Sequence, residues 1–285
     1  MNDNNIISVI GSGTMGNGIA HVFALSNKVS KVFLIDLDIN ILDKAKLIIK
    51  NNLNRQLQKK IISSSDAEDA LSKISFSTQI EDVAISNLII EAVKEDFNIK
   101  KNIFKSLDSL VDKNTILATN TSSISIDKIA NSINQSKNVI GMHFMNPVPI
   151  MKLVEIIKGS NTDVLIVKKT LEYVNLLNKI AIECNDSPGF VSNRILMPMI
   201  NEAAFTLMEG VAETDAIDGI MKLGMGHPMG PLKLADLIGI DVCVSIMKVL
   251  FEGFNNSKYE VCPLLVDMQN NNKLGVKTKE GFYKY

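Results

Sequence analysis

A short apolar segment that runs into three closely spaced glycines is the feature that most constrains the fold of this 285-residue chain. The apolar run at 6–10 is followed by GSGTMG at 11–16 and then by an amphipathic stretch, which predicts a strand, a tight turn and a helix. Gly11 permits the turn, Gly13 lets the backbone approach a ligand without an intervening Cβ, and Gly16 lets the helix pack closely on the strand. The N–H groups at the start of that helix would face an anion such as a pyrophosphate.

An acidic residue after the next apolar run extends this pattern. The run at 31–35 is followed by Asp36, twenty residues after Gly16, where a carboxylate can accept hydrogen bonds from the ribose hydroxyls of adenosine. The same carboxylate would repel a 2′-phosphate, so the sequence predicts NAD rather than NADP as the cofactor, with Met15 also at the site. The alternative is an ordinary glycine turn between a strand and a helix, with Asp36 as a helix cap.

Charge and cysteine content restrict the classes of partner. The chain has 30 basic and 31 acidic residues and no apolar run approaching the length of a membrane span, so neither nucleic acid nor a membrane is expected as a partner. No positively charged segment precedes the first apolar stretch. The three cysteines lack C-x-x-C spacing and the three histidines are scattered. We therefore expect free thiols, no metal site and a cytoplasmic protein.

Short apolar runs alternate with amphipathic stretches through the first two thirds of the chain, as in a doubly wound parallel sheet. We expect strands at 6–10, 31–35, 74–77, 87–91, 115–119, 139–144, 153–157 and 180–183, and helices at 39–61, 99–111 and 162–177. Ligands of such sheets bind beyond the carboxyl ends of the strands. Gly11, Asp36, Glu91 and Asn120 are all expected at that edge.

A proline–glycine segment at 185–190 marks the predicted domain boundary. Beyond it the periodicity is helical, and we expect helices at 195–208, 212–223, 231–238 and 242–250. The sequence thus predicts an α/β Rossmann-type doubly wound sheet over 1–186, followed by a smaller all-α domain over 187–285. We expect the substrate in the cleft between the two domains, and a homodimer contact on the helical domain, which is rich in Met and Leu.

His143 is the candidate acid or base. The predicted strands at 139–144 and 153–157 are joined by a short proline-rich bend, which favours antiparallel pairing and brings His143 close to Glu155. A neutral imidazole, with a pKa of about 6.5, can accept the proton of a substrate hydroxyl near neutral pH. A carboxylate on its other ring nitrogen would fix the tautomer and stabilise the imidazolium. On the residues alone, a structural histidine with satisfied hydrogen bonds remains the alternative.

Seven ordered motifs resemble, in sequence and spacing, the 3-hydroxyacyl-CoA dehydrogenase family. They are GSGTMGNGIA at 11–20, EAVKE at 91–95, NTSS at 120–123, GMHFMNP at 141–147, KLVEI at 152–156, SPGFVSNRI at 187–195 and HPMGPL at 227–232. The resemblance extends from residue 6 to the C-terminal GFYKY and is strongest to members without an attached hydratase domain. It implies an oxidoreductase that converts an (S)-3-hydroxyacyl-CoA thioester, such as 3-hydroxybutyryl-CoA, to the 3-ketoacyl-CoA with NAD, and catalyses the reverse reduction.

The resemblance also implies roles for individual residues. His143 would be the general acid or base and Glu155 its orienting partner, while Ser122 and Asn193 would bind the substrate. Without the motifs, Ser122 is typical of a turn after a strand, and Asn193 of a helix cap.

Further positions would bind the cofactor and the CoA group. Glu95 and Lys100 would approach the nicotinamide ribose, with Glu91 and Asn120 beside them at the cofactor site. Arg55 and Lys59, on the basic face of the helix at 39–61, would meet the CoA phosphates. From composition alone that face is a solvated surface.

Two positions depart from the family pattern. Gly226 precedes His227 where the family usually has Asn, and the segment around Val276 lacks the usual Arg. These departures concern domain packing or the subunit contact. Two other functions remain open, a dehydrogenase of a free hydroxy acid or sugar acid on the same fold, and a non-catalytic NAD-binding structural protein. The first should ignore CoA and tolerate loss of Arg55 and Lys59. The second would be expected to lose His143, Glu155 or Asn193, and this sequence keeps all three.

Overall fold

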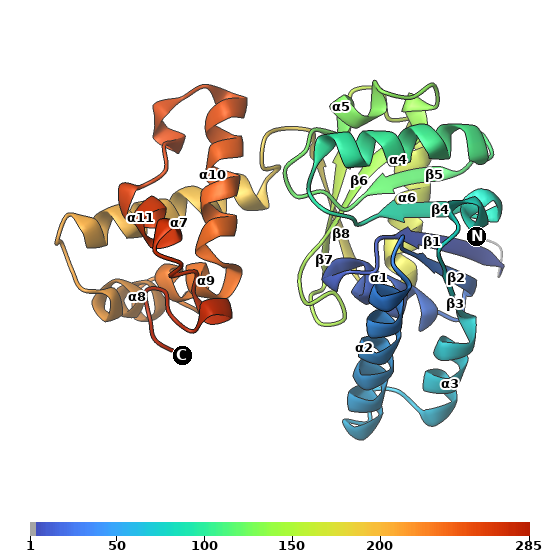
Figure 1. The fold of residues 1–285 in the computed structure, drawn as a ribbon, viewed down its shortest axis with the longest axis horizontal. Coiled ribbons are helices and arrows are strands. Elements are labelled where there is room, and N and C mark those ends of the chain that lie inside the picture. The colour runs from blue at the N-terminus through green and yellow to red at the C-terminus, as the bar shows by residue number, and fades with distance from the viewer. Residues whose placement is uncertain (1–3) are drawn as a thin grey trace. The chain divides into compact units, whose positions relative to one another are not determined.

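The computed structural model describes residues 4–285. Its internal contacts divide the chain into two compact units, the first ending at Asp186 and the second comprising Ser187–Tyr285. The first unit is a sheet covered by helices and the second consists of helices and short connecting segments (Figure 1). The predicted fold class, a Rossmann-type sheet followed by an all-α part, is confirmed.

The sheet has eight strands in the order β3-β2-β1-β4-β5-β6-β7-β8. The strands are β1 (Asn5–Ile10), β2 (Val29–Ile35), β3 (Ile74–Ser77), β4 (Leu88–Glu91), β5 (Ile116–Thr119), β6 (Val139–Phe144), β7 (Leu153–Lys158) and β8 (Ile180–Asn185). Neighbouring strands run parallel except for β6 and β7, which are antiparallel. The parallel register pairs Ile10 with Glu91 and Glu91 with Thr119, so that the carboxyl ends of β1, β4 and β5 lie at one edge.

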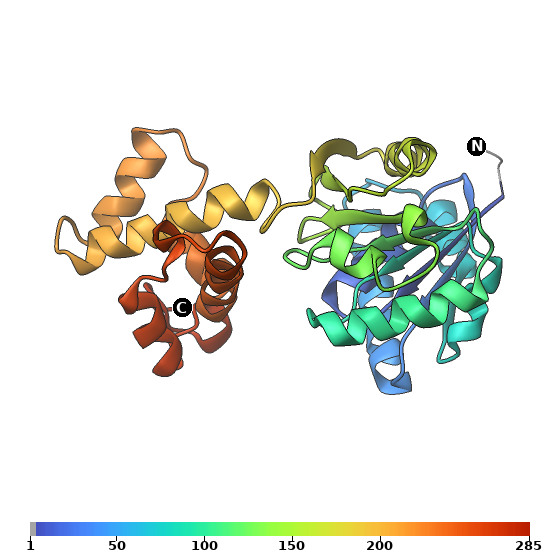
Figure 2. The ribbon, with the colours of Figure 1, turned by 90° about the horizontal axis from the view of Figure 1, so that it is seen from above.

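Helices cover both faces of the sheet. They are α1 (Thr14–Ala24), α2 (Ile39–Gln58), α3 (Ser64–Lys73), α4 (Phe97–Leu110), α5 (Ile126–Ala130) and α6 (Val164–Leu176), with short 3₁₀ helices at Ile80–Ile85 and Ser136–Asn138. Figure 2 shows α4 and α6 on opposite sides of the strands. Val9 of β1, Leu42 of α2 and Tyr173 of α6 belong to one apolar cluster. Phe104 of α4 and Ile129 of α5 are fully buried on the other side, since successive side chains of a strand point to opposite faces.

The predicted helix over 39–61 is helix α2 in the structure and is slightly shorter than predicted, and a second helix, α3, follows it. The first ends at Gln58, and Lys60 takes a left-handed conformation with φ 57°, which an α-helix cannot continue. Ser63 then caps the next helix, because its hydroxyl accepts from Asp66 N while the Asp66 carboxylate accepts from Ser63 N. This Ser-x-x-Asp capping box is a recognisable start signal for a helix, although α3 is not among the predicted elements.

The second unit is built from five α-helices. They are α7 (Ser192–Met208), α8 (Thr214–Leu223), α9 (Pro231–Ile238), α10 (Ile240–Phe254) and α11 (Pro263–Asn270), with 3₁₀ helices at Ser257–Tyr259 and Val276–Thr278. Helix α11 is not among the predicted elements. The C-terminal segment is anchored by the buried Asp236, whose carboxylate accepts hydrogen bonds from Phe282 N and Tyr283 N at 2.9 Å each.

Candidate functional site

The glycine turn between β1 and α1 has the geometry of a phosphate-binding loop. Gly11 has φ 95°, and a Cβ there would lie 2.7 Å from the Ala92 carbonyl oxygen. A Cβ on Gly16 would lie 1.7 Å from the Gly11 carbonyl oxygen, so both positions require glycine. A Cβ on Gly13, in contrast, would have no protein atom within 4 Å. Because no side chain caps α1, its first N–H groups can serve an anion beside Gly13.

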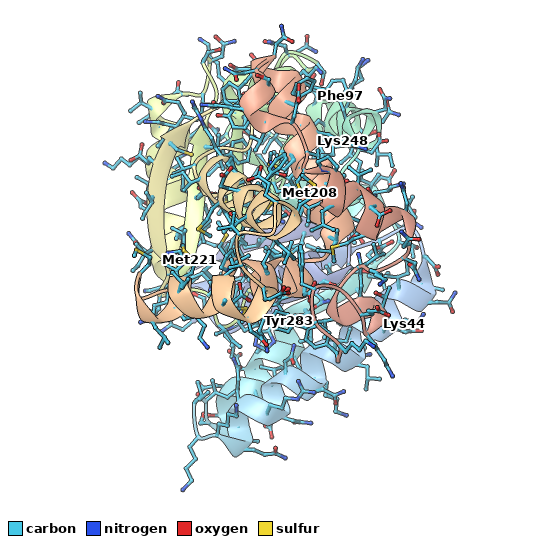
Figure 3. All side chains as sticks on the ribbon, turned by 90° about the vertical axis from the view of Figure 1, so that its left-hand side faces the viewer. Lys44, Phe97, Met208, Met221, Lys248 and Tyr283 are labelled. Atoms are coloured by element: carbon cyan, nitrogen blue, oxygen red, sulfur yellow. The ribbon has the colours of Figure 1, made fainter. Side chains whose placement is uncertain are left out.

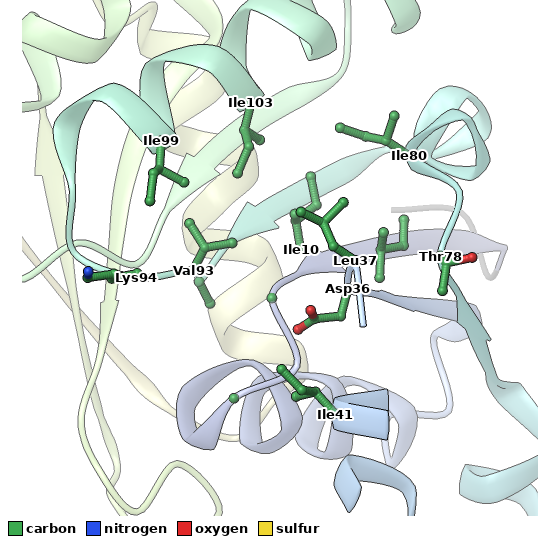
Figure 4. A pocket seen from close by; sticks show the side chains of 14 residues that line it. Ile10, Asp36, Leu37, Ile41, Thr78, Ile80, Val93, Lys94, Ile99 and Ile103 are labelled. Carbon is green, nitrogen blue, oxygen red and sulfur yellow. The ribbon is translucent and has the colours of Figure 1, made fainter. Parts of the chain in front are cut away.

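Asp36 lies at the end of β2 beside this turn. Its Oδ2 accepts hydrogen bonds from Ser12 N at 2.7 Å and from the Ser12 hydroxyl at 2.8 Å. A pocket of about 370 Å³ adjoins the carboxylate and is lined largely by apolar side chains, among them Ile41, Ile80 and Val93 (Figure 4). An apolar slot next to a carboxylate that can accept hydrogen bonds suits the adenosine half of a dinucleotide.

Met15, the remaining predicted residue of the loop, is partly buried. Its side chain packs against the apolar cluster that includes Val9 and Phe23. The residue therefore joins the loop to the core of the first unit. Whether it also contacts the cofactor stays a prediction.

His143 and Glu155 face each other across the only antiparallel strand pair that the described part of the sheet contains. The register of β6 and β7 sets the two residues opposite, and His143 Nδ1 lies 2.8 Å from Glu155 Oε2. Both side chains are almost entirely buried. A carboxylate at this distance accepts the Nδ1 proton and thereby sets which ring nitrogen can exchange a proton with a ligand.

The predicted cofactor residues Glu91 and Lys100 form a buried ion pair. Glu91 Oε1 lies 2.7 Å from Lys100 Nζ, and the two side chains are 0% and 1% exposed. Glu91 also accepts hydrogen bonds from Val93 N and from the Thr119 hydroxyl at 2.7 Å each. Lys100 Nζ lies 3.2 Å from Glu95 Oε2 as well. The ammonium group thus stands between two carboxylates, which compensates for the burial of the charges.

Glu95 is the most accessible member of this cluster, with a side chain 37% exposed. Its Oε1 accepts hydrogen bonds from the Thr121 and Ser123 hydroxyls and from the backbone N–H groups of Ser122 and Ser123. Burial by itself raises the pKa of Glu95, but the charge of Lys100 and these hydrogen bonds outweigh it and lower the pKa overall. Glu95 is therefore an anion at neutral pH.

Asn120 connects the end of β5 to the strand that carries His143. Its side-chain Oδ1 accepts from Phe144 N at 2.9 Å, and its backbone N–H donates to the Glu91 carbonyl at 2.7 Å. The predicted residues Glu91, Glu95, Lys100, Asn120 and Ser122 are thus brought together within the first unit.

The remaining predicted residues lie elsewhere. Arg55 is exposed in the last turn of α2, and Lys59 follows that helix as its cap. Asn193 is the second residue of α7, in the helical unit, and is buried. The roles of these three residues stay predictions.

Several residues with a structural part in the site carried no prediction of their own. Ser12 holds Asp36, while Thr121 and Ser123 surround Glu95. A run of Thr and Ser directly after a buried strand is a typical site of side-chain to backbone hydrogen bonding, and that signal was available. Lys179 donates to the Val148 and Met151 carbonyls at 2.6 Å each and fastens the bend between β6 and β7, a contact that no local pattern indicates.

Metal-binding clusters and membrane-spanning helices are both absent from residues 4–285. No group of three or more His, Cys, Asp or Glu side chains there is arranged to hold a metal ion. No helix in that part of the chain is both long and apolar enough to cross a membrane.

Comparison with known proteins gives a consistent result along the whole chain. A family model of the NAD-binding domain of 3-hydroxyacyl-CoA dehydrogenase matches residues 6–187, and a model of its C-terminal domain matches residues 189–285. A 3-hydroxybutyryl-CoA dehydrogenase of Clostridioides difficile is 48% identical over 98% of this chain and 99% of its own length. The human mitochondrial hydroxyacyl-coenzyme A dehydrogenase is 39% identical over 98% of this chain and 90% of its own length.

A solved structure agrees with the family models. The (S)-3-hydroxybutyryl-CoA dehydrogenase of Ralstonia eutropha superposes with a TM-score of 0.95 at 40% identity, covering 99% of both chains. The family models, the relatives and the dinucleotide-binding turn together establish NAD as the cofactor and the chain as an enzyme. The chain belongs to the 3-hydroxyacyl-CoA dehydrogenase family of oxidoreductases.

Proposed function

We propose that this enzyme interconverts (S)-3-hydroxybutyryl-CoA and acetoacetyl-CoA with NAD, using His143 as the general acid or base. The observation that carries the proposal is the 2.8 Å contact between His143 Nδ1 and Glu155 Oε2, on a sheet whose edge also holds the glycine turn. The relatives named as 3-hydroxybutyryl-CoA dehydrogenases at 44% to 48% identity support the choice of substrate.

In the oxidation, bound NAD would supply the acceptor for the hydride that leaves C3 of the substrate. His143 takes the proton of the 3-hydroxyl at Nε2, because Glu155 accepts the hydrogen of Nδ1. The carboxylate then stabilises the imidazolium that forms. In the reverse direction protonated His143 donates to the ketone oxygen, so acidic solution favours reduction.

Other residues of the proposed site bind the substrate. The Ser122 hydroxyl donates a hydrogen bond to the substrate oxygen, and Asn193 of the helical unit contributes to holding the thioester. Arg55 and Lys59 attract the CoA phosphates, since both are exposed and neither has an ion-pair partner among the described residues.

The cofactor takes the glycine turn and the pocket beside Asp36. The N–H groups beside Gly13 and Gly16 would bind its pyrophosphate, with Met15 in the same loop, and Asp36 would accept from its adenosine ribose. Glu95 would bind the nicotinamide ribose, and Lys100 would hold Glu95. In this proposal residues 1–186 form the NAD-binding domain.

We also propose that residues 187–285 carry a homodimer contact. Large apolar side chains are exposed at and beside α8, including Val211, Ile220 and Leu223, which are 70%, 60% and 90% exposed. An apolar groove of about 340 Å³ lies between α7 and α8. Figure 3 looks onto this unit and labels Met208 at the end of α7 and Met221 on α8.

The free cysteines Cys184, Cys243 and Cys262 accord with a reducing compartment and support a cytoplasmic location.

The decisive experiment follows NADH absorbance after the purified protein is mixed with NADH and acetoacetyl-CoA. Consumption of NADH that requires both the CoA group and His143, tested with free acetoacetate and with His143→Ala, is the expected result. Consumption with free acetoacetate alone would move the assignment to a free hydroxy acid dehydrogenase. Binding of NADH without turnover of either compound would indicate a non-catalytic NAD-binding protein.

A further inference from the structure

One carboxylate oxygen of Glu95 accepts several hydrogen bonds from the loop that follows β5. Glu95 Oε1 accepts from Ser122 N at 3.0 Å, Ser123 N at 3.1 Å, the Ser123 hydroxyl at 2.9 Å and the Thr121 hydroxyl. We propose that Glu95 is a positioning residue that holds the loop at 120–124, and with it Ser122, in the geometry needed for catalysis. The inference rests on the proposed function only in taking Ser122 as a substrate-binding residue.

The contact is of a kind that fixes a backbone. Two successive N–H groups that point at one anion form a concave anion-binding turn. In this loop the anion is supplied by the protein itself, from the connection between β4 and α4. Thr121 is fully buried, and its hydroxyl also accepts from Ile124 N at 2.8 Å. Glu95 and Thr121 therefore define the course of the chain on both sides of Ser122.

Glu95 is in turn fastened to the sheet. Lys100 Nζ lies 3.2 Å from Glu95 Oε2 and 2.7 Å from Glu91 Oε1. Glu91 is the last residue of β4 and accepts from the Thr119 hydroxyl at the end of β5. Through these contacts the Ser122 loop is attached to β4 and β5, two buried strands that are less free to move than a surface loop.

The charge of Glu95 matters for the strength of this arrangement. Hydrogen bonds to an ionised acceptor are roughly twice as strong as those between neutral groups. Lys100 and the loop hydrogen bonds lower the pKa of Glu95 in spite of its burial. Removing the charge while keeping the shape should therefore loosen the loop.

Lys100 is too deeply buried to be a ligand of the cofactor. Its side chain is 1% exposed and its ammonium is shared by two carboxylates. We assign it the task of orienting Glu95. Substitution of Lys100 is unsuitable as a test, because it would leave Glu91 as a buried charge without its cation.

The test uses Glu95→Gln and Glu95→Ala, with Glu68→Gln as the matched control because Glu68 is exposed on α3. Ser123→Ala is a second kind of variant, which removes one donor to Glu95 Oε1 and leaves the carboxylate in place for a cofactor. Hydrogen exchange of the full-length protein is measured for the amides of Ser122 and Ser123, with those of β1 as an internal reference for intact folding. Turnover of acetoacetyl-CoA and the Kd of NADH are measured on the same samples.

We expect amide exchange at Ser122 and Ser123 to accelerate about tenfold in Glu95→Gln, more in Glu95→Ala and less in Ser123→Ala. Exchange in β1 and in Glu68→Gln should stay at the wild-type rate. The kcat for acetoacetyl-CoA should fall about tenfold in Glu95→Gln. In a Ser122→Ala background the same substitution should have little further effect, because both changes act through one group.

Two results would overturn the positioning role. One is unchanged amide exchange at Ser122 and Ser123 in Glu95→Ala. The other is a double variant of Glu95 and Ser122 whose loss of kcat equals the product of the losses in the two single variants. A loss confined to the Kd of NADH would accompany the first of these and leave Glu95 as a cofactor ligand only. Failure of the proposed function is recognised separately, since the wild-type protein would then not consume NADH with acetoacetyl-CoA, and the exchange rates alone would decide the role of Glu95.

Discussion

His143 Nδ1 and Glu155 Oε2 are 2.8 Å apart because an antiparallel register sets the two residues opposite each other, near the end of β6 and the start of β7. The imidazole is thereby held by a carboxylate on a neighbouring strand and not by a mobile loop. A base that must accept a proton during hydride transfer benefits from this arrangement, since its orientation and tautomer are set before the substrate arrives.

Replacing the carboxylate should separate catalysis from cofactor binding. In Glu155→Gln we expect kcat to fall about 100-fold, because the imidazolium loses its counter-charge, while the Kd of NADH changes little. Glu183→Gln is the matched control, since Glu183 lies on the adjacent β8 and forms only an exposed pair with Lys158 at 3.1 Å. Wild-type turnover in Glu155→Gln would remove the pair from the mechanism.

Cofactor choice should depend on the charge of Asp36. We expect Asp36→Ala to lower the preference for NADH over NADPH at least about tenfold, measured as the ratio of the two kcat/KM values. Ser12→Ala keeps the carboxylate and removes only the hydroxyl that donates to it, so this variant should retain most of the preference. If Asp36→Ala rejects NADPH as strongly as the wild type, the cofactor argument fails.

The basic end of α2 should bind the CoA group by charge. In the double variant Arg55→Gln, Lys59→Gln we expect the KM of acetoacetyl-CoA to rise about three- to tenfold at low salt, with a smaller difference at high salt. Lys44→Gln, near the other end of the same helix, is the control. An unchanged KM would support an enzyme that does not recognise CoA phosphates at this helix.

The exposed apolar side chains of α8 should be covered by a second copy of the chain. We expect Leu223→Glu to shift the molar mass measured by light scattering from that of a dimer toward that of a monomer, because a carboxylate would be buried in the contact. Ile61→Glu changes an apolar residue that is 65% exposed in the first unit and should leave the mass unchanged. A monomeric wild-type protein would refute the homodimer.

His21 should make the first unit sensitive to acid. Its side chain is buried, with Nε2 3.1 Å from Gln56 Oε1 and no hydrogen-bond partner for Nδ1 among the described residues. Burial lowers the pKa of His21, and the hydrogen bond to Gln56 offsets this only in part. The unfolded chain, with a histidine pKa of about 6.5, therefore binds the proton first as the pH falls.

The stability associated with neutral His21 is complete above about pH 6.5 and is lost as the pH falls from there toward the lowered pKa. His21→Gln should consequently show a smaller decrease of Tm than the wild type between about pH 7 and pH 5. Circular dichroism at a series of pH values measures the difference. A steeper decrease in the variant would contradict the assignment of this acid sensitivity to His21.

Much of the fold is predictable because its signals are local. Gly11 and Gly16 indicate a turn that only residues without a Cβ can make. The alternation of apolar runs with amphipathic stretches indicates a parallel sheet, and the short bend between 144 and 153 indicates the one antiparallel pair. Helix α3 was not predicted, although Ser63 and Asp66 form a recognisable capping box and the sequence therefore contains a local signal for this helix.

The hydrogen-bond and ion-pair partners of the site residues could not be predicted from local sequence patterns. Nothing near Glu95 in the sequence shows that its carboxylate meets Ser122 and Ser123, which are more than 25 residues away. The burial of Lys100 between Glu91 and Glu95 likewise depends on how α4 lies on the sheet. Residue type and spacing can identify such residues as candidates, but they do not show which polar groups will be hydrogen-bonded or ion-paired with each other.

The sequence by itself determined the succession of the eight strands, the glycine turn and the opposition of His143 and Glu155, because each depends on short-range sterics or on strand register. The tertiary structure alone decided that Glu95 holds the Ser122 loop and that Ser12 holds Asp36. The reason is physical. A buried charge must find partners, and which partners come within about 3 Å is known only once separate elements have packed together.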